Sequence, residues 1–429
     1  MTAFASGSLA VRIPRALLDP SAGTLPAPDP DGLLAVRLHW AEGRITRLEP
    51  LEGDDGIRPL PLALTPLLEP HAHLDKAFTA AAFPNRAGTM DAALAANRRE
   101  FAERTAGQVL ERGERALQLA WRHGVRAIRS HIDGVGPAAE PSWQALRQLQ
   151  ERWRGRVELQ LVLLAPLSHW STAGGEAQAR ELAAAGALLG GVLGPPYRFG
   201  ADEPQLLLQL LRLAEGLGTG VDLHVDEGDC QPGRGMALVA RTVQEQRLAL
   251  PITCSHASSL GLLAGPRLER AVEQVAAAEL TVVALPTTNL WLLGRRPEGT
   301  PLLRPLAPVV ALQQAGVLVA VGGDNVQDPW FPGGDFDPLA VLGFSAMAAH
   351  LVPWERQGLA PFTTAAARLL GLSWDGVLRP GAPADLVVLG ATGWNGLLAR
   401  PPQRRVLRQG GWLEPPANET PSPLLSDCR

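Results

Sequence analysis

The chain has 429 residues, of which 46% are hydrophobic and 19% charged, and its formal net charge is −4. This length and apolar content are enough to build a large core in one domain with a satellite, or in two or three domains. The sequence contains no Lys/Arg-rich run and no stretch of about 18 uninterrupted apolar residues, so we expect neither nucleic acid nor a membrane as a partner.

Targeting and redox features favour the cytoplasm. Residues 1–10 lack a basic segment followed by an apolar core, so we expect no secretion signal. The three cysteines, Cys230, Cys254 and Cys428, are scattered and form neither a disulfide framework nor a CxxC metal site. Strand alternation puts Cys254 on the face of His256, where we expect it to be inert packing.

Short apolar runs alternate with amphipathic stretches through most of the chain. The candidate strands are Leu64–Pro70, Val125–His131, Val157–Ala165, Leu188–Leu193, Gly220–His224, Pro251–His256, Leu280–Leu285 and Val317–Val321. The helix-like segments include Ala92–His123, Ser142–Trp153, Gly175–Ala187, Glu203–Gly216, Gly235–Gln246 and Arg267–Ala277. Eight strands with intervening helices predict the α/β class and a (β/α)8 barrel of the TIM type.

Both flanks of this pattern have a different character. Leu34–Leu51 has two alternating runs around Ala-Glu-Gly at 41–43, which predicts a hairpin. Gly376–Leu389 and Arg404–Leu413 predict further strands near the other end. We interpret residues 1–62 and 376–429 as one small β-sandwich built from both chain ends around a barrel of residues 63–375. The Pro- and Ser-containing stretch Glu414–Arg429 is expected to be loose.

The only lysine of the chain, Lys76, follows a His-x-His pair made of His71 and His73. Side chains at i and i+2 of a strand point to the same face, so both imidazoles can reach one metal ion from a strand end. Two-metal hydrolases of this general type often bridge their ions with a carbamylated lysine from a central strand. No lysine is available for that role, so we expect a single ion.

Three further candidate ligands follow other predicted strands. His224, His256 and Asp324 each lie where a strand reaches the C-terminal mouth of the barrel, so we expect them to meet His71 and His73 in space. A zinc or iron(II) site needs several nitrogen or oxygen ligands and an open position for water. A lone histidine is more often structural, but five suitable residues at four strand ends indicate a metal centre.

This set resembles the amidohydrolase superfamily and, within it, the cytosine deaminase branch, over nearly the whole chain. The matching segments are His71-x-His73-Leu74-Asp75, His224-x-Asp226-Glu227, Ser255-His256, Gly322-x-Asp324-x-Val326-x-Asp328-Pro329-Trp330, Asn289 with Gly294-Arg295, and Pro380-Gly381-x-Pro383-Ala384-Asp385-Leu386. The other zinc deaminase type needs H-x-E with P-C-x-x-C, and the absence of a CxxC motif excludes it.

The resemblance implies a role for each matched residue. One divalent ion, Fe(II) or Zn(II), would be bound by His71, His73, His224 and Asp324, and hydroxide formed on it would attack the substrate. Asp324 would also take a proton from the water. Glu227 would carry a proton to a ring nitrogen and then to the leaving ammonia, and His256 would stabilise the tetrahedral intermediate.

The substrate side departs from cytosine deaminases at three positions. They carry a glutamine where this chain has Leu167, a second acid where it has Asn325, and no lysine at the position of Lys76. We therefore expect Lys76 and Asn325 to recognise a carbonyl oxygen or an anionic group of the substrate. Trp330 is expected to wall the substrate ring, the alternative being ordinary core packing.

Two other residues have open interpretations. Tyr197, the only tyrosine, either lines the mouth of the barrel or packs beside it. His131 either supports the site or is a satisfied core histidine, and we favour the core interpretation.

The predicted activity is hydrolysis of a carbon–nitrogen bond in a small nitrogen heterocycle. The leading hypothesis is a metal-dependent aminohydrolase that deaminates a cyclic amidine such as cytosine or a related amino-pyrimidine or triazine. The second is hydrolysis of another C–N bond, in an N-alkylamino-triazine or a cyclic amide, which would release an amine rather than ammonia. The third is a non-catalytic structural barrel, which a missing ligand would favour. The sequence leaves a homo-oligomer open.

Overall fold

The structure is a computed structural model that describes residues 6–21, 25–51, 59–194, 202–296, 298–414 and 425. Tyr197 and nearly all of the tail expected to be loose lie outside the described residues. The chain divides into two compact units. The smaller contains Met1–Leu68, Ala120–Arg126 and Asp337–Arg429, and the larger contains Glu69–Leu119 and Ala127–Phe336.

The larger unit confirms the predicted (β/α)8 barrel. Its sheet has eight strands in sequence order: β5 Leu68–Ala72, β6 Ala127–Asp133, β7 Glu158–Pro166, β8 Leu188–Leu193, β9 Val221–Val225, β10 Ile252–His256, β11 Thr281–Ala284 and β12 Val319–Val321. A parallel bridge between Ala72 and Asp324 joins the ends of the first and last strands. The C-terminal ends of all eight strands therefore surround one mouth.

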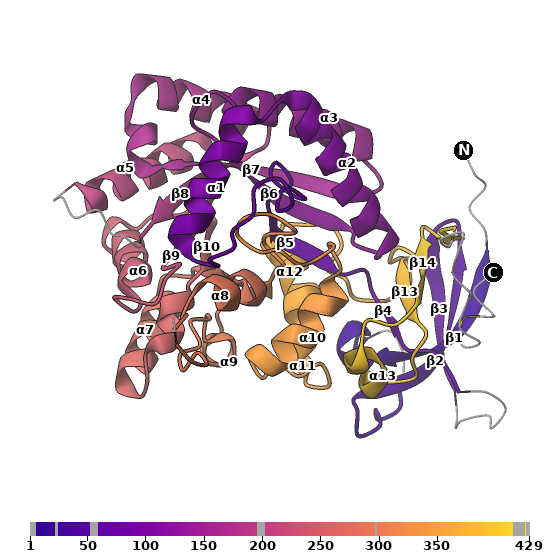
Figure 1. Ribbon diagram of the computed structural model, residues 1–429. Helices are drawn as coiled ribbons and strands as arrows, with labels where there is room; N and C mark the ends of the chain where they lie inside the picture. Colours follow the sequence, from indigo (N-terminus) through magenta and orange to yellow (C-terminus); the bar gives the residue numbers. More distant parts are fainter. Residues whose placement is uncertain are drawn as a thin grey trace. The chain divides into compact units, whose positions relative to one another are not determined.

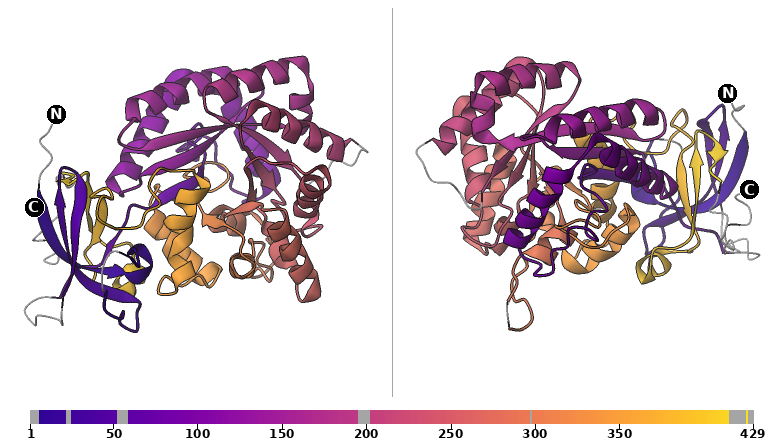
Figure 2. Two further views of the ribbon diagram at one scale, coloured as in Figure 1. Left: turned by 180° about the vertical axis from the view of Figure 1, so that it is seen from behind. Right: turned by 45° about the horizontal axis from the view of Figure 1, so that its top comes forward.

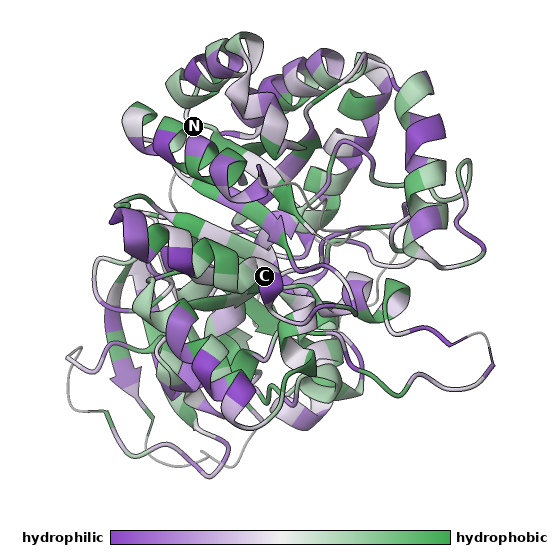
Figure 3. Ribbon diagram, turned by 90° about the vertical axis from the view of Figure 1, so that its left-hand side faces the viewer, coloured by the Kyte–Doolittle hydropathy of each residue, from purple (hydrophilic) through white to green (hydrophobic). Residues whose placement is uncertain are grey.

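Helices surround these strands in each view (Figures 1 and 2). They are α1 Met90–Glu103, α2 Ala106–Arg122, α3 Ala139–Trp153, α4 Ala173–Ala184, α5 Glu203–Leu217, α6 Arg234–Gln246, α7 Pro266–Ala277, α8 Pro286–Leu292 and α9 Val309–Gln314. Polar and apolar segments alternate along the helices (Figure 3). In α6, for example, Val239 and Val243 are buried four residues apart while Glu245 is exposed, as expected for a helix with one face on the core.

Two predicted elements have different bounds in the structure. The first barrel strand begins at Leu68 rather than Leu64, because Ala63–Leu64 form a separate strand, β4, paired with β13. Pro66 lies between them and has no backbone N–H for a continuous ladder. The single helix expected over Ala92–His123 is two helices, since Arg104 has extended backbone angles that end α1.

The smaller unit confirms that both chain ends contribute to one sheet domain. Its first sheet has the order β1 Gly7–Pro14, β2 Leu33–Ala41 and β3 Arg44–Pro50, and its second the order β15 Gly411–Trp412, β14 Arg404–Arg408, β13 Leu386–Leu389 and β4. The predicted hairpin is β2–β3, and Glu42 and Gly43 turn it with φ of 51° and 75°, as a two-residue hairpin loop requires. Strand β1 was not predicted.

The described residues of the same unit also form the α-helices α10 Pro338–Ala348, α11 Arg356–Leu359, α12 Thr364–Leu369 and α13 Trp394–Ala399. The predicted domain boundaries at residues 62 and 375 stay a prediction. No helix among the described residues has the length and apolar character needed to cross a membrane.

Candidate active site

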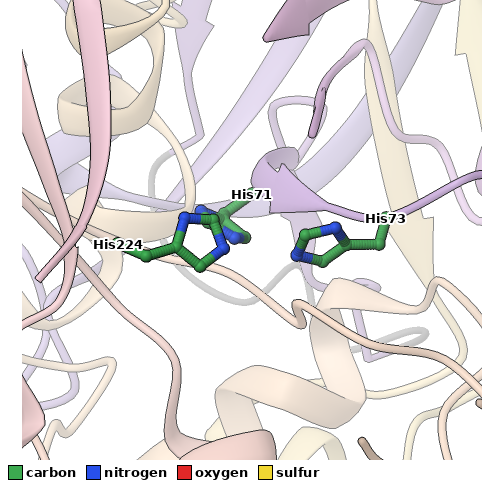
Figure 4. Close-up of side chains that lie close together, drawn as sticks. All are labelled: His71, His73 and His224. Atoms are coloured by element: carbon green, nitrogen blue, oxygen red, sulfur yellow. The ribbon is translucent and has the colours of Figure 1, made fainter. Parts of the chain in front are cut away.

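The predicted metal ligands meet at the mouth of the barrel. His71 lies in β5 and His73 directly after it, His224 lies in β9, and Asp324 follows β12. The ring centroid of His71 is 5.3 Å from that of His73 and 4.8 Å from that of His224 (Figure 4). Oδ1 of Asp324 lies 3.3 Å from Nε2 of His73 and 3.6 Å from Nε2 of His71. Residues about 250 positions apart in sequence thus share one buried space, as the C-terminal mouth of a barrel permits.

Left-handed backbone conformations occur at the ends of three barrel strands, β9, β10 and β12. Asp226, His256 and Asp324 have φ of 55°, 71° and 63°. Such angles in residues other than glycine cost of order 1–3 kcal/mol and persist only where surrounding contacts hold them. Here the backbone N–H of Asp324 donates to the carbonyl of His71 at 3.0 Å, and that of Ala257 to the carbonyl of Val225 at 2.8 Å.

The cluster fits a divalent metal ion. Nε2 of His71, Nδ1 of His224 and both carboxylate oxygens of Asp324 are buried and have no hydrogen-bond partner of good geometry among the described residues. An unpaired buried polar group costs about 1–3 kcal/mol, so such a concentration of acceptors calls for a ligand. Imidazole nitrogens with one carboxylate are a donor set that suits zinc or iron(II).

A second grouping, of His71, His131 and Asp222, lies beside the first and is a poorer metal site. Oδ2 of Asp222 accepts a hydrogen bond from the Arg129 guanidinium at 2.8 Å, and Oδ1 accepts one from Ser255 at 2.8 Å. Both oxygens are therefore occupied, and a guanidinium that always carries its charge adjoins them. An ion is better accommodated beside the unpaired oxygens of Asp324.

Burial favours the neutral imidazole forms of His71 and His224. It lowers the pKa of His71 and His224 well below the usual value of 6.5, and the neighbouring histidines lower both further. Burial alone would raise the pKa of Asp324, but His73 and His256 outweigh it, so this carboxyl group has a pKa below its usual range. Neutral imidazole and ionised carboxylate are the forms that bind metals.

Glu227 and His256 adjoin each other next to the cluster. Oε2 of Glu227 lies 3.7 Å from Nε2 of His256. Burial raises the pKa of Glu227 well above 4.5, and the charge of Asp324 raises it further. Burial also lowers the pKa of His256 to about 4, and its Nδ1 lies 2.9 Å from the side-chain amide of Asn289. A carboxyl group with a raised pKa can give and take protons near neutral pH.

Asp226, the middle residue of the His-x-Asp-Glu segment, has a structural role. Its carboxylate accepts hydrogen bonds from the backbone N–H groups of Gly235 at 2.8 Å and Met236 at 3.0 Å, in the first turn of α6. A carboxylate there satisfies helix N–H groups that have no partner within the helix. The bonds tie the loop after β9 to α6 and so fix the position of Glu227.

Lys76 is held in a buried network of alternating charges. Its Nζ lies 2.7 Å from Oδ1 of Asp133, whose other oxygen is 3.1 Å from Arg104. Arg104 also pairs with Asp75 at 2.7 Å and with Glu100. Burial would lower the pKa of Lys76, but Asp133 and Asp75 raise it above 10.5, so the ammonium is charged.

The other predicted substrate residues are also engaged within the protein. The amide nitrogen of Asn325 donates to Oδ2 of Asp328 at 2.7 Å. Leu167 follows β7, is buried, and lies against Gly191 of β8. Trp330 packs against the apolar cluster that includes Leu292 and Leu293, which matches the core-packing alternative. None of these contacts tests the predicted roles, which stay predictions.

Sequence reasoning missed several polar residues around the site. Arg129 and Asp133 share one face of β6 with His131, since they are two residues apart. That alternation of polar side chains in a buried strand was the available signal. Arg104 had no such signal, because it contacts Asp75 and Asp133 from a helix end 29 residues away from each.

Comparison with known proteins identifies the family of the chain. The model of the Amidohydrolase family matches residues 87–410. A pterin deaminase of Rhizobium rhizogenes (strain K84 / ATCC BAA-868) is 30% identical over 394 residues, covering 90% of this chain and 89% of the relative. The structure of 5-methylcytosine deaminase from Klebsiella pneumoniae liganded with phosphonocytosine superposes with a TM-score of 0.79, at 24% identity over 96% of this chain and 100% of that one. The structure of N-isopropylammelide isopropylaminohydrolase from Burkholderia multivorans ATCC 17616 superposes with a TM-score of 0.71, at 26% identity over 94% of this chain and 98% of that one.

The barrel fold and these similarities place the chain in the amidohydrolase superfamily, in its deaminase branch. The chain belongs to the Amidohydrolase family. It is accordingly an enzyme that hydrolyses carbon–nitrogen bonds.

Proposed function

We propose that this chain is an aminohydrolase that releases ammonia from an amino-substituted nitrogen heterocycle, with one Fe(II) or Zn(II) ion bound by His71, His73, His224 and Asp324. The observation that carries the proposal is the combination at one mouth of unpaired metal-binding atoms and a carboxyl group, Glu227, 3.7 Å from His256. A metal site alone would suit many functions, but an adjoining proton carrier suits hydrolysis.

In this proposal, different residues bind the metal, transfer protons and stabilise the intermediate. A bound divalent ion would supply a Lewis acid that lowers the pKa of a water molecule. Asp324 accepts a proton from the attacking water, whose oxygen bonds to the ring carbon that carries the amino group. Glu227 delivers its proton to the adjacent ring nitrogen. As the carbonyl forms, the hydroxyl proton of the intermediate passes through Glu227 to the amino group, the C–N bond breaks and ammonia leaves, and Asp324 returns its proton to Glu227. His256 donates a hydrogen bond from Nε2 to the oxygen of the tetrahedral intermediate.

Substrates with a 2-amino-4-oxopyrimidine ring are the first candidates, and pterins contain one. The similarity to a pterin deaminase along 90% of the chain supports them. So does the buried ammonium of Lys76, since a fixed cation can bind a ring carbonyl oxygen. Cytosine is a weaker candidate, because Leu167 offers no hydrogen bond where cytosine deaminases carry an amide. A cytoplasmic location completes the proposal.

The test is a substrate panel assayed for two products. Protein loaded with Fe(II) or Zn(II) is incubated with pterins, aminopyrimidines including cytosine, aminotriazines, N-alkylamino-triazines and lactams, and ammonia and alkylamine are measured separately. Ammonia from at least one amino-heterocycle, with no alkylamine, is the expected result. The second candidate function, amine release, is favoured by the similarity to an isopropylaminohydrolase. Alkylamine without ammonia would replace the proposal with it.

A further inference from the structure

A chain of short hydrogen bonds leads from the barrel interior to His71. Nδ1 of His71 lies 2.8 Å from Oγ of Ser255, Ser255 donates to Oδ1 of Asp222 at 2.8 Å, and Arg129 donates to Oδ2 of Asp222 at 2.8 Å. All four residues are at least 97% buried. The chain joins β5, β10, β9 and β6, so the packing of four strands fixes its geometry.

The direction of these bonds follows from which groups can donate. A guanidinium donates only, so Asp222 accepts from Arg129, and an ionised carboxylate accepts at its other oxygen as well. Ser255 has one hydroxyl proton, and it points to Asp222. Oγ of Ser255 can therefore only accept from Nδ1 of His71, which places the imidazole proton on Nδ1.

We infer that Ser255, held by Asp222 and Arg129, is a positioning residue that fixes His71 in the tautomer whose Nε2 lone pair faces the metal. Nε2 of His71 is the nitrogen that is buried without a partner and lies 3.6 Å from Asp324. The ring of His131 stacks on His71 at 3.8 Å between centroids and 24° between planes, which limits rotation of the imidazole. Hydrogen bond and stacking together leave His71 one orientation.

The expected consequence concerns metal affinity rather than chemistry on the substrate. Loss of a partner that orients a metal-binding histidine typically weakens binding about 10- to 100-fold. The Ser255→Ala variant keeps every metal ligand and removes the hydroxyl that accepts from His71 and donates to Asp222. A matched control is Ser142→Ala in α3, because Ser142 is also a buried serine and its hydroxyl donates to the backbone carbonyl of Ala138 at 2.7 Å.

Affinity is measured by titrating Zn(II) into metal-depleted full-length protein in competition with a chromophoric chelator. The inference predicts that Ser255→Ala weakens Zn(II) binding about 10- to 100-fold, while Ser142→Ala binds like wild type. A folded Ser255→Ala variant whose Zn(II) affinity lies within about threefold of that of wild type would overturn the inference, because this loss is smaller than the expected one.

A spectroscopic readout needs no altered Ser255. In Zn(II)-loaded wild-type protein with ¹⁵N-labelled histidine, His71 should give a slowly exchanging proton signal coupled to Nδ1, assigned by its absence from a His71→Asn variant. A proton on Nε2 instead would refute the inference. The inference rests on the proposed metal site, and the outcomes are separable: wild-type protein that binds no Zn(II) refutes that site, whereas normal binding by Ser255→Ala refutes only the role of Ser255.

Discussion

Nζ of Lys76 lies 2.7 Å from Oδ1 of Asp133, and only 3% of Lys76 is exposed. The lone lysine of the chain is therefore a fixed ammonium rather than a flexible surface charge. The charge of Lys76 lowers the pKa values of Glu227 and Asp328. Burial has the larger effect and raises both pKa values. The ammonium of Lys76 has three N–H donors. Asp133 accepts from one of them, which leaves two that can contact a substrate.

Replacing Lys76 by methionine should raise KM or lower kcat/KM at least tenfold, about 1.4 kcal/mol, without changing the metal content. Methionine keeps the length of the side chain and removes the charge that would bind a carbonyl or anionic group. Steady-state kinetics on the substrate found in the panel, with metal analysis of the same preparation, provide the measurement.

Arginine at position 76 should restore little, because a planar guanidinium is longer and differently shaped than an ammonium. Lys76→Arg with wild-type kinetics would show that the lysine has no specific role in binding the substrate.

The Glu227→Gln substitution should leave the metal in place and lower kcat by about 10² to 10⁴. Glutamine has nearly the same shape but cannot carry a proton between the ring nitrogen and the leaving group. Turnover is compared with metal content in both proteins. Turnover within threefold of wild type would rule out the proton-carrying role of Glu227.

Arg104→Ala should destabilise the protein by about 3–5 kcal/mol, because it removes the arginine paired with the buried carboxylate of Asp75 and one of the two arginines paired with Glu100. Urea unfolding compares it with Arg180→Ala, which removes an exposed pair with Glu176 and should cost less than about 1 kcal/mol. Equal effects of the two substitutions would mean that the buried network contributes nothing specific to stability.

The sequence allowed prediction of those parts of the site that follow strand periodicity. His71, His224 and Asp324 lie near the ends of apolar runs, and barrel topology brings such ends together. The left-handed backbone angle of His256 could not be predicted. Strand alternation placed Cys254 on the same face as His256, and it did not reveal that Ser255 contacts His71. Partners such as Arg129 and Asp222 are 93 residues apart, and no local pattern encodes their pairing.

The central claim is a single metal ion held by four residues at three strand ends, and metal analysis of purified protein tests it most directly. Wild-type protein should contain one tightly held Fe(II) or Zn(II) per chain, and His71→Ala and His224→Ala should lose both that ion and activity. Two tightly held ions per wild-type chain, or full metal content in His224→Ala, would contradict the account.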